Sequence, residues 1–150
     1  MTQLRVEIDF DASPEQAWEV LEKVEDHVDW MEDAVALDFV SGQRQGVGTS
    51  FDCLTKVGPI KLTDRMTITE WEDAAVMGVR HEGMVTGTGR FTLTEVGAGR
   101  TNFVWEEDLS FPIWLGGPIG EKVARPILGF IWNRNLINLK RIVEAHAQRR

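Results

Sequence analysis

A single cysteine, Cys53, occurs among the 150 residues of the chain. One cysteine excludes an intrachain disulfide and a cluster of thiolate metal ligands, so nothing in the composition demands an oxidising compartment. The sequence also has no apolar run long enough to cross a bilayer, because its longest apolar stretch, 111–132, contains Glu121, Lys122 and Arg125. We therefore expect no stable membrane insertion.

Basic residues are scarce, with 16 Lys and Arg against 24 Asp and Glu and a formal net charge of -8. A polyphosphate would have to bind against that field, so we expect no nucleic-acid partner. The first residues carry charges at Arg5, Glu7 and Asp9 where a secretory signal peptide needs an apolar run, which predicts a cytoplasmic protein. The length and the hydrophobic content of 43% suit one domain over residues 1–150.

Apolar residues alternate with polar ones along most of the first 110 residues. This period of two is typical of strands with one buried face and one wet face. Seven sets of alternating residues define the predicted strands: Leu4, Val6, Ile8 and Phe10; Val35, Leu37 and Phe39; Phe51, Cys53, Thr55 and Val57; Ile60, Leu62, Met66 and Ile68; Met77, Val79 and His81; Phe91 and Leu93; Phe103, Trp105, Glu107 and Leu109. Short glycine-containing turns between successive sets predict an antiparallel sheet.

Two predicted helices follow the first strand and one ends the chain. Ser13, Pro14 and Gln16 supply an N-cap, a proline in the first turn and a capping box. A short second helix is indicated near residues 28–31. Residues 127–147 read as a long helix of about 31 Å, which is enough to lie across a seven-stranded sheet about 29 Å wide. Residues at three- and four-residue spacing predict its sheet-facing stripe: Leu128, Trp132, Leu136, Leu139 and Val143.

This order of elements resembles the START-like, helix-grip (SRPBCC) superfamily, which includes polyketide cyclases/dehydrases, Bet v 1-like plant pathogenesis-related proteins and lipid-transfer domains. The matching pieces are Ser13-Pro14 with Trp18, Trp30, Val47-Gly48-Thr49, Leu139-Lys140 and Val143-Glu144. The resemblance implies an α+β fold of β-α-α-β6-α order. A seven-stranded antiparallel curved sheet would wrap around the C-terminal helix, with an apolar cavity between them. It implies no particular catalytic residues, because the superfamily has no universal catalytic set.

The chain contains no tyrosine. Members of the superfamily that cyclise aromatic polyketides are expected to orient phenolic intermediates with hydroxyl and guanidinium groups. Without tyrosine, that orienting work would fall to acidic side chains, His81, threonines or indole N–H groups.

Three ionisable residues occupy strand faces that are otherwise apolar, namely Asp64, His81 and Glu107. A buried carboxylate without a partner is costly, so such groups acquire a shifted pKa or a nearby partner. A carboxyl group facing a histidine can act as a general acid–base pair, which makes these three the candidate catalytic residues. Alternatively, each one is wet, anchors a polar part of a ligand, or pairs with a structural arginine such as Arg65 or Arg90.

No local spacing of histidines supports a metal site, and His27 and His146 fall on segments predicted to be surface helix. A phosphate loop, a nucleophile elbow and a dinucleotide fingerprint are also absent from the sequence, since Gly87-Thr88-Gly89 precedes a strand. We therefore expect neither a metal nor a cofactor.

Segment 111–120 concentrates large apolar residues among glycines and prolines. One interpretation is a mobile rim over a cavity mouth, with Gly116-Gly117 as a hinge and Trp114 or Leu115 touching a ligand or lipid. In the other, Ile113, Trp114 and Leu115 plug one end of the core. Both interpretations stay open.

The sequence favours binding of a small hydrophobic or amphipathic molecule (lipid, isoprenoid or polyketide-like) between the sheet and the last helix, by a monomer or homodimer. The residues expected to contact it are Phe51, Cys53, Met66, Met77, Val79, His81, Phe91, Phe103, Trp105, Glu107, Trp114, Leu128, Trp132, Asn135 and Leu136. Two alternatives are a cyclase/dehydrase-type enzyme that uses the acids and histidine of the cavity, and a regulatory module whose acidic surface binds a protein.

Overall fold

The computed structural model describes residues 2–149, and its strands form one antiparallel sheet in the order β1-β7-β6-β5-β4-β3-β2. The strands are β1 (Thr2–Phe10), β2 (Ala34–Phe39), β3 (Ser50–Val57), β4 (Ile60–Glu72), β5 (Val76–Glu82), β6 (Thr86–Gly97) and β7 (Arg100–Ser110). The helices are α1 (Pro14–Leu21), the 3-10 helices η1 (Val24–Asp29) and η2 (Ile113–Leu115), and α2 (Gly117–Gln148). The predicted fold class, a seven-stranded curved sheet that grips a long C-terminal helix, is confirmed.

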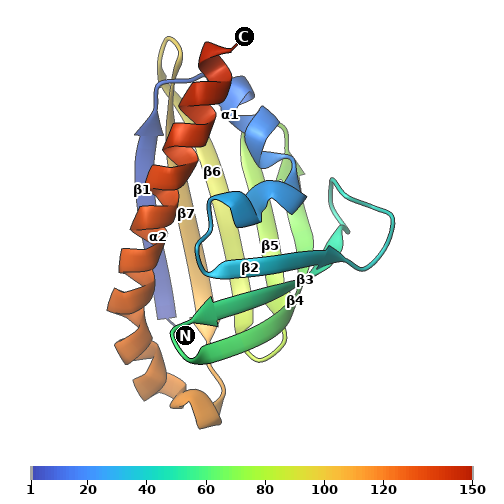
Figure 1. The fold of residues 1–150 in the computed structure, drawn as a ribbon, viewed down its shortest axis with the longest axis vertical. Coiled ribbons are helices and arrows are strands. Elements are labelled where there is room, and N and C mark those ends of the chain that lie inside the picture. The colour runs from blue at the N-terminus through green and yellow to red at the C-terminus, as the bar shows by residue number, and fades with distance from the viewer. Residues whose placement is uncertain (1, 150) are drawn as a thin grey trace.

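The sheet twists strongly from one edge to the other. Strands β1, β7 and β6 run along α2, whereas β2 and β3 run across that direction on the other side of the molecule (Figure 1). Register shifts in β2, β4 and β6 mark irregularities that add bend and local twist. Because α2 packs mainly on β1, the middle of the sheet curves away from it and leaves room beneath the helix.

Helix α1 begins at the predicted capping box. The Oγ of Ser13 accepts a hydrogen bond from Gln16 N at 3.2 Å, and Gln16 Oε1 accepts one from Ser13 N at 3.0 Å. These bonds satisfy two backbone donors that a helix start leaves unpaired. Ala17, Trp18 and Leu21 are buried, and they hold one end of the sheet closed against α2.

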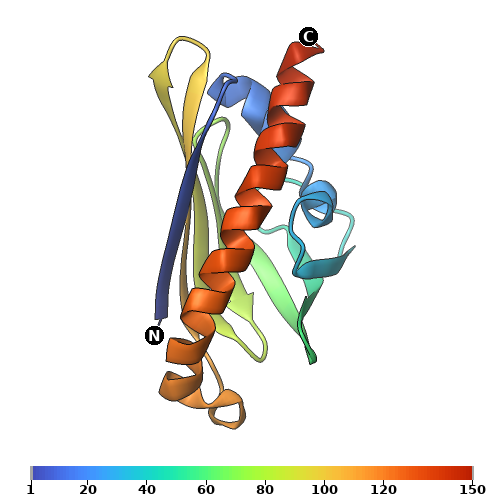
Figure 2. The ribbon, with the colours of Figure 1, turned by 60° about the vertical axis from the view of Figure 1, so that its left-hand side comes forward.

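Helix α2 is longer than predicted, because it starts at Gly117 instead of Ile127 and runs for 32 residues, about 48 Å. Pro126, which directly precedes the predicted start, lies inside the helix. Proline removes one helical hydrogen bond, but this position is exposed, so water can hydrate the freed carbonyl. The first turns of α2 and η2 extend past the end of the sheet (Figure 2).

The predicted sheet-facing stripe of α2 is confirmed in its C-terminal part, where Trp132, Leu136, Leu139 and Val143 are buried. Leu128 is partly buried against the same core. Aromatic rings pack between this part of the helix and the sheet, where the indoles of Trp105 and Trp132 stack with their centroids 4.4 Å apart. No helix within residues 2–149 is long and apolar enough to cross a membrane.

Candidate functional site

A cavity of about 470 Å³ lies between the inner face of the sheet and α2. This volume falls within the range of small-molecule pockets, roughly 300–1,000 Å³. Its wall is mostly apolar and comes from η1, strands β2 to β7, η2 and the first half of α2. Most residues predicted to contact a ligand line it: Phe51, Cys53, Met66, Met77, Val79, His81, Phe91, Trp105, Glu107, Leu128 and Trp132.

The other four residues of that prediction lie elsewhere, which corrects their expected placement. Phe103, Asn135 and Leu136 are at most 1% exposed and sit within the solid part of the core, where α2 packs directly on the sheet. Trp114 is 63% exposed and is not part of the cavity lining. Alternation along a strand or helix predicts which residues face inward, but it does not separate those that pack from those that line a space.

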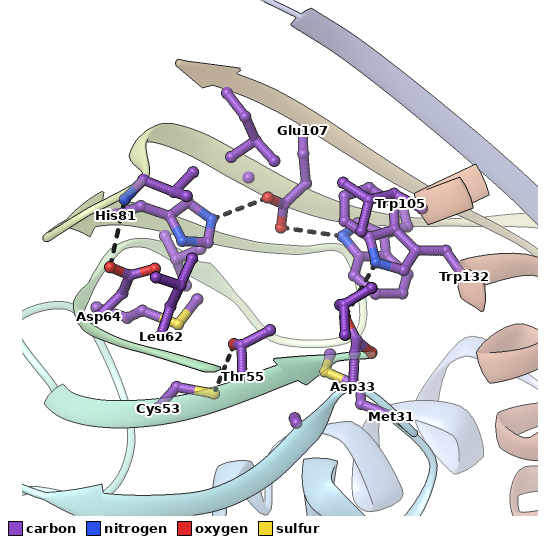
Figure 3. Close-up of a pocket in the computed structure, with 18 of the residues that line it drawn as sticks. Met31, Asp33, Cys53, Thr55, Leu62, Asp64, His81, Trp105, Glu107 and Trp132 are labelled. Atoms are coloured by element: carbon purple, nitrogen blue, oxygen red, sulfur yellow. Dashed lines mark hydrogen bonds and ion pairs between the residues drawn. The ribbon is translucent and has the colours of Figure 1, made fainter. Parts of the chain in front are cut away.

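The three ionisable candidates meet along one wall of the cavity, as Figure 3 shows. His81 on β5 places its Nε2 2.9 Å from Oε2 of Glu107 on β7, a contact that is ionic when the imidazole is protonated. The other oxygen of Glu107, Oε1, accepts a hydrogen bond from Trp105 Nε1 at 3.2 Å. Asp64 on β4 uses Oδ1 to accept bonds from Met84 N at 2.8 Å and Val85 N at 3.4 Å, in the β5–β6 turn.

The His81–Glu107 contact forms across an intervening strand, β6. In the register of the sheet, Gly89 of β6 lies opposite Glu107, and Gly87 lies opposite His81. A Cβ atom on Gly89 would come within 2.6 Å of Glu107 Oε1. Because Gly89 carries no side chain, the carboxylate of Glu107 can extend over β6 to reach His81.

The pKa of His81 is raised above its ordinary value by a balance of opposing effects. Burial disfavours the imidazolium and lowers the pKa, but the carboxylates of Glu107 and Asp64 favour it and outweigh the burial. The two carboxylates thus make His81 a stronger base than an isolated histidine, although it lies inside an apolar cavity.

A second polar group at the cavity wall, Asp33, escaped the sequence analysis. Its Oδ1 accepts a hydrogen bond from Asn135 Nδ2 at 2.8 Å, and its Oδ2 accepts one from Trp132 Nε1 at 3.3 Å. Asn135 Oδ1 in turn accepts from Glu32 N at 2.9 Å. Asp33 lies in an irregular segment between η1 and β2, where no periodicity could have predicted that it faces inward.

Cys53 lines the cavity as a protonated thiol. Burial, chiefly, raises its pKa to about 11, and the nearest polar partner, Thr55 Oγ1, lies 4.0 Å from the sulfur. A thiol with such a pKa is a poor nucleophile at neutral pH. Cys53 therefore contributes to the wall as a small apolar group.

Segment 111–120 forms η2 and the start of α2 at the cavity mouth. Ile113 is 92% exposed, so neither it nor Trp114 plugs the core, whereas Leu115, Gly116 and Ile119 line the cavity. The mouth is thus rimmed by apolar side chains, and opening and closing of this rim stays a prediction.

Within residues 2–149, no group of three His, Cys, Asp or Glu side chains is arranged to hold a metal ion. His27, expected on a surface helix, is only 6% exposed and also lines the cavity. Its Nε2 lies 2.8 Å from the carbonyl oxygen of Leu21, and burial lowers its pKa. It was misplaced because η1, which carries it, is a tight turn of 3-10 helix tucked under the sheet.

Residues 1–144 match the family model described as polyketide cyclase / dehydrase and lipid transport. Three solved structures share the fold at low identity. The aromatase/cyclase Zhui from Streptomyces sp. R1128 is 19% identical, with 99% of this chain and 94% of that chain covered and a TM-score of 0.71. A START superfamily protein from Mycobacterium smegmatis is 10% identical, with 99% of both chains covered and a TM-score of 0.71. The protein XoxI from Bacillus cereus is 14% identical, with 95% of this chain and 96% of that chain covered and a TM-score of 0.73. A search of curated proteins found no significant match to the sequence.

Proposed function

We propose, from the premise that this chain belongs to the polyketide cyclase / dehydrase and lipid transport family, that the protein binds a small apolar or amphipathic molecule beneath α2. The observation that carries the proposal is the cavity of about 470 Å³, which is lined mostly by apolar side chains. Protein interiors are normally close-packed, with few voids larger than a water molecule, so a space of this size indicates a binding site. A lipid, an isoprenoid or a polyketide-like molecule would bury its apolar surface there.

Native mass spectrometry tests this proposal with a matched pair of variants. Leu62 on β4 lines the cavity, whereas the adjacent Thr63 is exposed on the opposite face of the strand. A Leu62→Trp substitution fills part of the cavity and should abolish retention of an added long-chain alcohol, while Thr63→Trp should leave it unchanged. Equal retention by both variants would exclude the cavity as the binding site.

A second candidate function, catalysis of the cyclase/dehydrase type, is favoured by the contact between His81 and Glu107 inside the cavity. A protonated His81 could donate a proton to a departing hydroxyl group while the carboxylate of Asp64 accepts one from the neighbouring carbon, so that water is lost and a double bond forms. Both groups line the same cavity wall. Turnover of a β-hydroxy ketone would be measured for His81→Gln and Asp64→Asn, and unchanged rates would remove both residues as catalysts.

A further inference from the structure

The carboxylates of the cavity wall differ in how fully their oxygens are engaged. Both oxygens of Asp33 accept hydrogen bonds from side chains, and both oxygens of Glu107 are engaged by Trp105 and His81. Asp64 differs from them: Oδ1 accepts two backbone N–H groups, but no donor within residues 2–149 reaches Oδ2. Asp64 is nevertheless only 7% exposed.

Oδ2 of Asp64 is not sealed inside the protein, since it is not among the buried polar atoms that lack a partner. Because Asp64 lines the cavity, its second oxygen is available to whatever occupies that space. A buried acceptor that stays unpaired costs free energy, so a ligand that brings a donor to this point gains a bond that the protein itself does not supply.

The charges on the cavity wall also favour a ligand that donates hydrogen bonds. Three carboxylates line the cavity, those of Asp33, Asp64 and Glu107, and the imidazole Nε2 of His81 is engaged by Glu107 at 2.9 Å. Arg90 also contributes to the lining, but its guanidinium pairs with Glu70, with Nη2 2.8 Å from Oε1, in an exposed ion pair. No cation on the described part of the wall is therefore free to receive an anionic ligand.

We propose that the cavity selects an amphiphile whose head group donates hydrogen bonds and carries no negative charge, a hydroxyl or an amine, and that Asp64 is the residue that receives it. This inference rests on the proposed function, since it names the chemical class of the molecule held beneath α2. A fatty-acid carboxylate would instead bring a like charge to Asp64 and leave Oδ2 unpaired, which is costly in a low-dielectric site.

Calorimetric titration with three probes of equal chain length tests the head-group selection. Decanol, decylamine and decanoate would be titrated into the wild-type protein at neutral pH, each below its micelle-forming concentration. We expect decanol and decylamine to bind at least about tenfold more tightly than decanoate. Equal affinities, or a preference for decanoate, would overturn the inference and leave the proposed function standing. No binding of any probe would overturn both.

Asp64→Asn sharpens the test, because asparagine keeps an oxygen for the amides of Met84 and Val85 while it removes the charge. We expect the affinity ratio of decylamine to decanoate to fall by about tenfold in this variant. Asp38→Asn, at an exposed position on β2, makes the same change in net charge outside the cavity and should leave the ratio unchanged. An equal fall in both variants would mean that net charge, and not Asp64, sets the preference. If Asp64→Asn does not fold, the wild-type probe series alone decides.

Discussion

Glu107 and His81 belong to strands that are not neighbours, and their contact depends on a missing side chain in the strand between them. Gly89 has an ordinary strand conformation, so it is not required by backbone strain. What it provides is space, because its hypothetical Cβ would meet Glu107 Oε1. A glycine in a strand interior weakens the sheet and often marks a place where another group approaches closely, and here that group is the Glu107 carboxylate.

Gly89→Ala should therefore push the Glu107 carboxylate away from His81 without unfolding the protein, since the displaced group is the end of a flexible side chain. With the nearest carboxylate withdrawn, burial dominates and the pKa of His81 should fall. The imidazole resonances of His81, followed by NMR over a pH series, measure the change. Gly97→Ala is the control, because Gly97 lies in the same strand and a Cβ atom there would be 4.0 Å from its nearest neighbour, the Cβ of Arg100. An unaltered His81 titration in Gly89→Ala would show that the pair tolerates a methyl group.

The raised pKa of His81 also predicts how the stability of the protein depends on pH. The folded state binds a proton more tightly here than the unfolded chain, whose histidine pKa is about 6.5. The stabilisation by His81 is therefore complete below about pH 6.5 and is lost as the pH rises through the folded-state pKa, by up to about 1.4 kcal/mol per pH unit.

Glu107→Gln should remove most of this alkaline decline, because burial then outweighs the remaining carboxylate. Urea denaturation of the variant and the wild type at several pH values above 6.5 provides the comparison. Parallel curves would assign the decline to another group. His27 does not confuse the result, because its lowered pKa affects stability only as the pH falls below about 6.5.

At the residue scale, the sequence predicted which side chains face the inside of the sheet, but not which side chains of different strands contact each other. Alternation alone placed Asp64, His81 and Glu107 on inner faces. The contact between His81 and Glu107 requires the register of three strands and an empty position in the middle one, which is information about pairing that no local pattern contains. Asp33 was missed for a different reason, because it lies in the irregular segment between η1 and β2, where no periodicity indicates which side chains face inward.

At the scale of elements, the segment before β2 is tied to α2 by Asn135, which is fully buried. Its amide bridges Asp33 and the backbone N–H of Glu32, and Arg134 Nη2 adds an exposed contact to Glu32 Oε1 at 3.1 Å. These bonds join residues about a hundred positions apart and fix one side of the cavity.

Asn135→Ala should destabilise the protein by about 1–3 kcal/mol, because it leaves Asp33 with one donor fewer and the Glu32 amide unpaired. Denaturant unfolding measures the loss. Asn133→Ala is the matched control, since Asn133 is exposed and bonds only to the Gly129 carbonyl within its own helix. A similar loss in both variants would mean that the bridge between the segments contributes nothing.

The long helix shows how an element can be predicted correctly and still be misjudged in extent. Its buried stripe was readable because apolar residues recur at helical spacing from Leu128 to Val143. The turns before Pro126 were missed although Ile119, Val123 and Ile127 also recur at a spacing of four residues, because the proline and the glycines at 116, 117 and 120 indicated irregular structure there. Pro118, which lies in the first turn, was the available signal for the true start.

At the scale of the whole molecule, occupancy of the cavity should appear as added stability. A ligand that binds only the folded state at a hundred times its dissociation constant adds about 2.7 kcal/mol, which corresponds to a rise in Tm of roughly 5–10 °C for a chain of this size. Decanol should produce this shift in the wild type and in Thr63→Trp but not in Leu62→Trp, as followed by differential scanning calorimetry. A rise in Leu62→Trp equal to that of the wild type would place the ligand outside the cavity.

The pairing of β1 with β7 has a consequence for the order in which the molecule can be assembled. Thr2 lies opposite Leu109 and Phe10 lies opposite Thr101 in the antiparallel register, and α2, which follows both strands in the sequence, packs mainly on β1. During synthesis, β1 therefore stays unpaired, with its apolar face uncovered, until β7 has emerged from the ribosome, which is after nearly three-quarters of these residues have been made. An apolar strand that stays unpaired for this long exposes a surface at which aggregation can begin and to which a chaperone can bind.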